Sequence, residues 1–254
     1  MFNTPGDPRS TTFGFNGGKW RVWIKPPGAT MVSIMCMGSG GTGGDGTATY
    51  LGDPPSAVAT GGTGGASGAV TRLVIPAMFL PDVLYVQVSS GGAPSYVSIY
   101  PSTTLQYVVL TSGGAATTSA ATAAAASSMV WGNLGVWSSI AGTISATWGA
   151  GGLPATAGGT GAGSTTSSEL AGTTITAGGL YKGNLKEGYW YKPLQITGGG
   201  AGASLVGAVA QTAYRGEMGS GGGGGAAFIS SDGTNASTTT GAAGGHGLVV
   251  IGAW

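Results

Sequence analysis

The residues that could carry catalysis are few and scattered in this sequence. His246 is the only histidine, and its type permits a general base or a metal ligand. Glu169, Glu187 and Glu217 are the only glutamates that could supply the paired carboxylates of a glycan depolymerase. A metal centre needs several His, Cys or carboxylate ligands, and the sequence offers no such group. We therefore predict no catalytic, cofactor-binding or metal-binding residues, and interpret His246 as a polar turn residue before the last strand.

Two further polar motifs have simple structural explanations. Cys36, the single cysteine, lies in Val-Ser-Ile-Met-Cys-Met and is predicted to be a buried apolar residue instead of a reactive thiol. Asp232 opens an Asp-Gly-Thr-Asn run that could offer oxygens to calcium, but no acidic residue nearby would complete the ligand set. An Asx-type turn is the better interpretation. The protein is predicted not to be an enzyme.

Aromatic side chains are the best candidates for recognition or subunit contact. One cluster of tryptophans lies in residues 113–168, and a second aromatic cluster covers residues 181–191. Exposed Tyr and Trp rings bind sugars or protein partners. The alternative, which we favour, is that these rings fill the core or a contact between subunits. The candidate residues are Trp131, Trp137, Trp148, Tyr181, Tyr189, Trp190 and Tyr191.

The composition indicates a protein that assembles. Residues 83–168 contain no charged side chain, and 54 of the 254 residues are glycine. An ordinary domain is about a quarter charged and about 7% glycine. Disorder is opposed by a hydrophobic content of 41% and by seven Trp and nine Tyr, which are enough to bury a core. A surface this neutral predicts coverage by neighbouring subunits in a homo-oligomer, with a trimer and a pentamer both compatible.

Several classes of partner are excluded by charge and hydropathy. Nine Lys and Arg oppose eight Asp and Glu, and no basic stripe exists, so we predict no nucleic-acid binding. The most apolar stretch, residues 129–144, is interrupted by Gly, Ser and Asn and is shorter than the roughly 20 residues of a membrane span. We predict no membrane insertion. The polar, proline-broken N-terminus does not resemble a signal peptide, which predicts synthesis in the cytoplasm.

Strand patterns dominate where glycine is absent. Residues 19–25 alternate, with Trp20, Val22 and Ile24 pointing one way and the basic side chains the other. Residues 31–37 are almost continuously apolar, which predicts a strand buried on both faces. The remaining predicted strands are 69–75, 83–89, 96–100, 105–111 and 248–251. These features predict an all-β fold, a jelly-roll-like antiparallel sandwich.

Long glycine-rich connectors separate the predicted strands. They cover Gly38–Gly46, Gly61–Gly68, Gly149–Gly163, Gly198–Gly202 and Gly219–Gly225. Two interpretations stay open: flexible loops, or extended polyproline-II segments that pack closely and bond to one another. The chain divides into an N-terminal arm (1–18), a sandwich framework (19–112 plus 198–254) and an aromatic-bearing insertion (113–197).

Three segments resemble a glycine-rich β-sandwich module of tailed-bacteriophage virion proteins, of the tail-fibre or minor structural type. They are the aromatic strand, Pro-Gly turn and hydrophobic strand of residues 20–41, the strand ending in paired glycines at 84–92, and the closing Gly-Gly-His-Gly, strand and Trp of 244–254. The resemblance implies a location in the virion and transfers no catalytic residues. The insertion departs from the simple module.

The expected function is therefore that of a non-enzymatic structural component of a bacteriophage virion, bound to itself and to other virion proteins. A head decoration, vertex spike or short fibre suits a chain of this length. The alternative is a receptor-binding adhesin at a fibre tip, whose glycine-rich loops would recognise a host surface glycan or protein.

Overall fold

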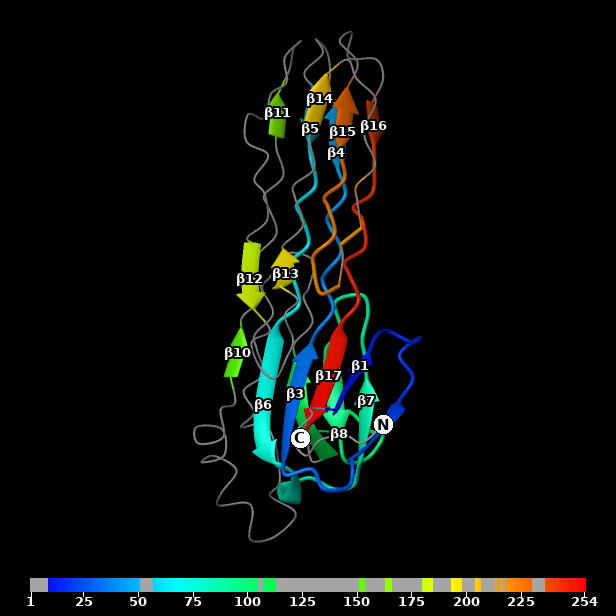
Figure 1. The fold of residues 1–254 in the computed structure, drawn as a ribbon. Helices are drawn as coiled ribbons and strands as arrows, with labels where there is room; N and C mark the ends of the chain where they lie inside the picture. Colours follow the sequence, from blue (N-terminus) through cyan, green and yellow to red (C-terminus); the bar gives the residue numbers. More distant parts are fainter. Residues whose placement is uncertain are drawn as a thin grey trace.

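The chain forms a β-sandwich at one end and a long glycine-rich bundle that leads to short strands at the other end (Figure 1). The computed structural model describes residues 9–50, 57–104, 107–112, 151–153, 163–165, 180–184, 193–197, 204–206, 213, 215–216, 218–229 and 236–254.

Two antiparallel sheets build the sandwich. The first has the order β1-β17-β3-β6-β10 and the second the order β2-β7-β8-β9. The strands of the first sheet are β1 (Arg9–Phe13), β17 (Leu248–Ala253), β3 (Met31–Met37), β6 (Val70–Pro76) and β10 (Gly151–Leu153). Those of the second are β2 (Arg21–Ile24), β7 (Val83–Gln87), β8 (Ser95–Ser98) and β9 (Val108–Ser112), and a 3-10 turn, η1 (Ala77–Phe79), follows β6.

The core lies between these two sheets. Alternate residues of β3, Val32, Ile34 and Cys36, are fully buried against Leu84 and Val86 of β7. The intervening residues Met35 and Met37 are also buried and pack on the other face of the first sheet. β3 is therefore buried on both faces, as its continuous apolar run predicts.

Strand β2 alternates as predicted, but its small apolar residues face outward. Trp23 is 4% exposed and lies in the core, whereas Val22 is 53% and Ile24 69% exposed. Arg21 lies on the inner side, where its guanidinium covers the ring of Phe13 in β1 at 5.0 Å. The alternation of side chains along a strand separates its two faces but does not say which face is buried. Here the face that carries the large indole ring of Trp23 is the buried one.

Short strands gather at the end of the molecule away from the sandwich (Figure 1). One sheet has the order β11-β5-β4, and another has the order β14-β15-β16. Their bounds are β4 (Thr47–Tyr50), β5 (Ala57–Thr60), β11 (Gly163–Thr165), β14 (Ser204–Val206), β15 (Ala227–Ile229) and β16 (Ala236–Thr238). Between these strands and the sandwich, β12 (Leu180–Asn184) pairs with β13 (Pro193–Thr197).

Four glycine-rich segments connect the sandwich to the far strands. We name them the outward segments 38–46 and 219–226 and the return segments 61–68 and 239–247. Their backbones bond to one another at every third residue. In segment 38–46 the amides of Gly40 and Gly43 donate to segment 239–247 at 2.9 Å, and those of Gly41 and Gly44 donate to segment 61–68 at 2.9 and 2.7 Å. The four segments therefore form one hydrogen-bonded bundle.

The bundle packs backbone against backbone. A methyl group added at its contact glycines would lie closer than 3.0 Å to a main-chain carbonyl of a neighbouring segment, a distance that real Cβ atoms essentially never show. These glycines recur at every third position: Gly40, Gly43 and Gly46, then Gly62, Gly65 and Gly68, then Gly222 and Gly225, then Gly241 and Gly244. A repeat of three matches a helix with three residues per turn, which places one residue in three on the same side.

The all-β prediction is confirmed, since nearly all of the regular structure described is strand and most pairings are antiparallel. Each of the predicted framework strands overlaps an observed one. The jelly-roll-like arrangement and the division into arm, framework and insertion stay predictions. Residues 9–13, within the predicted arm, form the edge strand β1 and pair with β17 along their whole length.

Candidate interaction surfaces

Most of the predicted aromatic candidates lie outside the described residues. These are Trp131, Trp137, Trp148, Tyr189, Trp190 and Tyr191. The backbone of Tyr181 is placed on β12, opposite Ile196 of β13. The proposed roles of all seven residues in recognition or subunit contact therefore stay predictions.

The chain reverses direction twice beyond the bundle, once between β4 and β5 and once between β15 and β16. β4 and β5 are antiparallel neighbours, so the chain turns back between Tyr50 and Ala57. β15 and β16 are likewise antiparallel, so it turns back again between Ile229 and Ala236. The four strands that flank these reversals lie at the end of the bundle away from the sandwich (Figure 1). Connections on a rigid support are a common place for binding residues.

The outer face of the second sandwich sheet is apolar and tyrosine-rich. Ile24 of β2 lies opposite Val83 of β7, and Val22 lies opposite Tyr85. Val83 is 37% exposed, and Tyr100, two residues beyond β8, is 59% exposed. None of the outward positions described on β2, β7 and β8 carries a charge. Tyrosine and exposed aliphatic residues gathered on one face are typical of protein interfaces.

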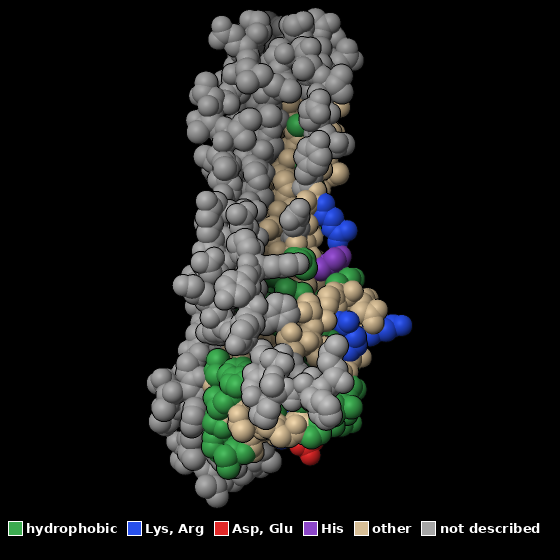
Figure 2. All heavy atoms as spheres, in the orientation of Figure 1, with side chains coloured by type: hydrophobic (Ala, Val, Ile, Leu, Met, Phe, Trp, Pro, Cys, Tyr) green, Lys and Arg blue, Asp and Glu red, His purple; other side chains and the backbone are tan. Residues whose placement is uncertain are grey.

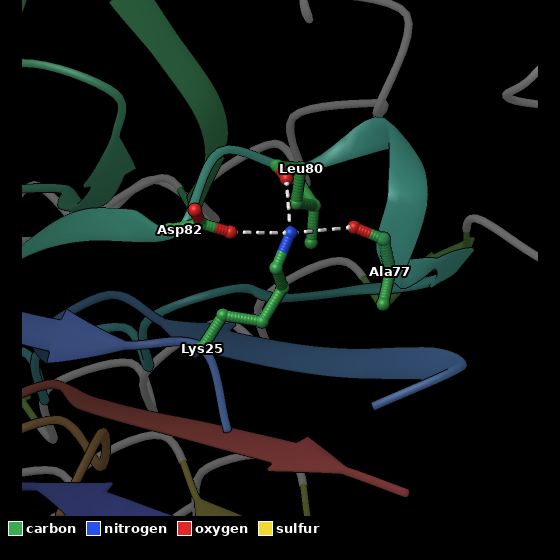
Figure 3. Close-up of polar contacts among 4 residues, drawn as sticks. All are labelled: Lys25, Ala77, Leu80 and Asp82. Carbon is green, nitrogen blue, oxygen red and sulfur yellow. Dashed lines mark hydrogen bonds and ion pairs between the residues drawn. The ribbon is translucent and has the colours of Figure 1, made fainter. Parts of the chain in front are cut away.

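A lysine ties the end of β2 to the turn after β6 (Figure 3). The ammonium of Lys25 donates to the carbonyl oxygens of Ala77 at 3.2 Å and Leu80 at 2.8 Å, and it forms an ion pair with Asp82 at 2.9 Å. The Lys25 side chain is only 18% exposed, whereas that of Asp82 is 85% exposed. The Ala77 carbonyl also accepts the Leu80 amide at 3.1 Å, so the lysine is its second donor, whereas at the Leu80 carbonyl the lysine supplies a donor at the end of η1. This contact is structural.

His246 lies in a small cationic and aromatic cluster beside the bundle. The guanidinium of Arg215 donates to Nε2 of His246, and the Phe15 ring stacks on the imidazole at a centroid distance of 4.3 Å. Because a guanidinium has no acceptor, Nε2 must accept, which leaves the ring neutral with its proton on Nδ1. Burial, with a further contribution from the charge of Arg215, lowers the pKa of His246.

The position of His246 supports a structural role. Figure 2 shows the purple histidine next to Lys and Arg side chains on one side of the molecule. Its carbonyl oxygen accepts the bond from the Gly219 amide at 2.8 Å, so the residue belongs to the bundle just before β17. The partner Arg215 comes from 31 residues earlier in the chain, and no local pattern in the sequence links the two residues.

Cys36 is confirmed as a buried residue. It is 0% exposed near the C-terminal end of β3, and its thiol donates to the Ser95 carbonyl oxygen at 3.3 Å. Burial raises the pKa of the Cys36 thiol far above its usual range, which suppresses the thiolate that any nucleophile or metal ligand would need.

Two further features were sought among the described residues: a cluster of metal ligands and a membrane-spanning helix. Among them, no three His, Cys, Asp or Glu side chains come together as ligands for a metal ion. No helix in the described part of the chain is long and apolar enough to cross a membrane.

No protein-family model matches this chain, and no curated protein sequence matches it. The function must therefore be inferred from the surfaces and from the bundle.

Proposed function

We propose that this chain is a non-enzymatic structural component of a bacteriophage virion that acts through assembly. The sandwich is its base, and the glycine bundle is a stiff spacer that holds the far strands away from that base. The observation that carries the proposal is the bonding of four backbone segments at every third residue. Such a bundle leaves no room for catalytic side chains in its interior but gives the chain a fixed long axis.

The glycine segments are proposed to be polyproline-II helices. This helix has three residues per turn and makes no internal hydrogen bonds, so its amides and carbonyls are free to bond to neighbours. Both properties agree with the repeat of the bonds and of the contact glycines. At about 3.1 Å per residue, a segment the length of 38–46 would extend roughly 28 Å.

The base is proposed to be a jelly-roll-like sandwich that contacts neighbouring subunits and other virion proteins. Its outer tyrosine and aliphatic face supports such a contact, because an exposed apolar surface of this kind is stabilised by burial against a partner. A head decoration, vertex spike or short fibre would each use a compact base and a projecting spacer.

The direct test locates the protein in particles. Antibody fragments against the purified chain are used to label particles of the phage that encodes it, and the native mass of the protein is measured in parallel. Labelled particles and a mass of two or more copies support assembly in the virion. A monomer that is absent from particles overturns the proposal.

A receptor-binding adhesin is the second candidate, because the strands that flank the two chain reversals share the end away from the sandwich (Figure 1). We would replace residues 51–56 and 230–235 with Gly-Ser sequence of the same length and measure adsorption of particles to host cells. As a second arm, Trp190 and Tyr191 are replaced by alanine. Loss of adsorption with normal particle assembly favours the adhesin. Normal adsorption with failed assembly favours the structural role alone.

A further inference from the structure

Asn16 and Gly17 form the single Asn-Gly pair of the sequence, and they lie in the short connection between β1 and β2. The other asparagines, at positions 3, 133, 184 and 235, are followed by Thr, Leu, Leu and Ala. A backbone nitrogen attacks the side-chain carbonyl carbon of the preceding asparagine most easily when it belongs to glycine, because glycine has no Cβ to obstruct the approach. The pair therefore has the residue types for a spontaneous reaction between side chain and backbone.

The structure leaves both reacting groups accessible. Asn16 and Gly17 are exposed, and a methyl group built on Gly17 meets nothing within 4 Å. Among the described residues, no hydrogen-bond partner is found for the Asn16 carboxamide or for the Gly17 amide. Water can therefore reach the pair, and no hydrogen bond to these two groups has to break before they approach each other.

The tip of this connection is a tight turn of two glycines. The Lys19 amide donates to the Asn16 carbonyl at 3.2 Å, and Gly17 and Gly18 have φ of 62° and 70°. After the turn, the Gly18 carbonyl accepts a bond from Nε2 of Gln87 at 2.6 Å, which ties the chain to β7. Glycine adopts positive and negative φ with similar ease, so the tip can change conformation while the strands on either side stay paired.

The charges around the loop favour the reaction. The guanidinium of Arg21 donates to the Gly14 carbonyl, and Lys19 directly follows the two glycines. Residues 14–25 contain no Asp or Glu. The attack creates negative charge on the backbone nitrogen and then on the carboxamide oxygen, and nearby cations stabilise such charge.

We propose that Asn16 is a site of spontaneous deamidation in the folded protein. The Gly17 nitrogen loses its proton and bonds to Cγ of Asn16, the bond from Cγ to the side-chain nitrogen breaks, and that nitrogen leaves with the proton as ammonia. Water then opens the cyclic imide. Opening at Cγ gives aspartate, and opening at the main-chain carbonyl carbon gives isoaspartate, whose backbone contains one additional methylene group.

Both products change the loop that lies against the bundle. Each product adds a negative charge to a loop whose charged residues are basic. Isoaspartate also lengthens the backbone directly after Phe15, whose ring stacks on His246. The inference goes beyond the proposed function and does not depend on it, because it uses only the loop and its surroundings.

The test incubates the folded chain at neutral pH and physiological temperature and follows every asparagine by peptide mapping with mass spectrometry. Isoaspartate is identified by enzymatic methylation, which labels isoaspartate and not ordinary aspartate. We expect Asn16 to convert at least about tenfold faster than any other asparagine, because glycine follows only this one. Conversion of Asn16 no faster than that of the other asparagines overturns the proposal.

The same measurement in urea shows whether the fold permits the reaction. Exposed loops open at little cost in free energy, so the native rate should lie within about tenfold of the rate in the unfolded chain. A slower native rate would show that the turn protects Asn16, which contradicts the proposal.

Asn16→Gln is the matched control. Attack on glutamine would close a larger ring, so this variant should not accumulate the acidic species that ion-exchange chromatography separates from the aged parent. Its melting temperature shows that it folds. An acidic species that forms equally in Asn16→Gln would place the reaction at another residue and overturn the proposal.

Discussion

Substituting one contact glycine by alanine should destabilise the whole molecule. In Gly43→Ala the new methyl group would lie closer than 3.0 Å to the carbonyl carbon and oxygen of Gly223 and to the amide nitrogen of Gly224. These are backbone atoms, so no rotamer change can relieve the overlap. Segments 38–46 and 219–226 must separate, although the bonds from Gly222 to Gly41 and from Gly225 to Gly44 hold them at 2.9 and 2.8 Å.

The size of the effect follows from these contacts. Overpacking in a tight interior costs about 1–3 kcal/mol. Weakening two hydrogen bonds adds roughly 1 kcal/mol each. Alanine also restricts the unfolded chain, which offsets the loss by about 0.4–1 kcal/mol. A net destabilisation of about 2–4 kcal/mol is expected, which lowers the melting temperature by roughly 5–15 °C for a chain of this size.

The matched control is Gly252→Ala. Gly252 lies in β17, and a methyl group added there meets nothing within 4 Å. Melting of both variants is followed by circular dichroism and by calorimetry. We expect Gly252→Ala to melt within a few degrees of the parent and Gly43→Ala well below it. If the two variants melt together, the close backbone packing of the bundle is wrong.

Three other sets of perturbations test the sandwich and the His246 cluster beside the bundle. Lys25→Met should lower the free energy of unfolding by about 1.5–3 kcal/mol because two carbonyl acceptors lose a charged donor. Asp82→Asn should lower it by less than about 1 kcal/mol because that carboxylate is exposed. Urea denaturation measures both variants, and equal losses would contradict this difference. The pKa of His246 is lowered in the folded state, so its contribution to stability is complete above its usual value of about 6.5 and is lost as the pH falls through that value toward the folded pKa. The decrease in melting temperature between about pH 7.5 and 5.5 should be smaller in His246→Gln, and an unchanged decrease would show that other groups cause it. Cys36 should react with a thiol reagent only when the protein unfolds, so rapid labelling of the native chain would contradict its burial.

Much of the sandwich could be predicted because its strands are apolar runs bounded by Gly and Pro. The strand at 31–37 and its burial on both faces follow directly from the run Met-Val-Ser-Ile-Met-Cys-Met. The inward face of β2 could not be predicted, since alternation leaves two choices and the larger Trp23 decides between them. β1 was missed because Arg-Ser-Thr-Thr-Phe is polar and owes its pairing to the edge of β17.

The sequence predicts that the glycine-rich segments could pack together, but it does not predict which segments become neighbours. Glycines spaced by three are present in the sequence at 40, 43 and 46 and at 62, 65 and 68, but adjacent glycines hide the repeat. Which segments become neighbours depends on the strands that start and end them, and this is a long-range property. The cluster of Arg215, His246 and Phe15 is unpredictable for the same reason, because three distant parts of the chain bring it together.

The bundle also changes the physical explanation of the unusual composition. A high glycine content first indicates a chain that is flexible or covered by other subunits, but in these four segments glycine is required where one backbone contacts another. The amides there bond to neighbouring carbonyls, so the interior needs no polar side chain. The neutrality of residues 83–112 has a different cause, since Leu84, Val86 and Leu110 are core residues. Most of the uncharged residues 113–168 lie outside the described residues, so the prediction of subunit contact rests on that part of the sequence and on the exposed face of the second sheet.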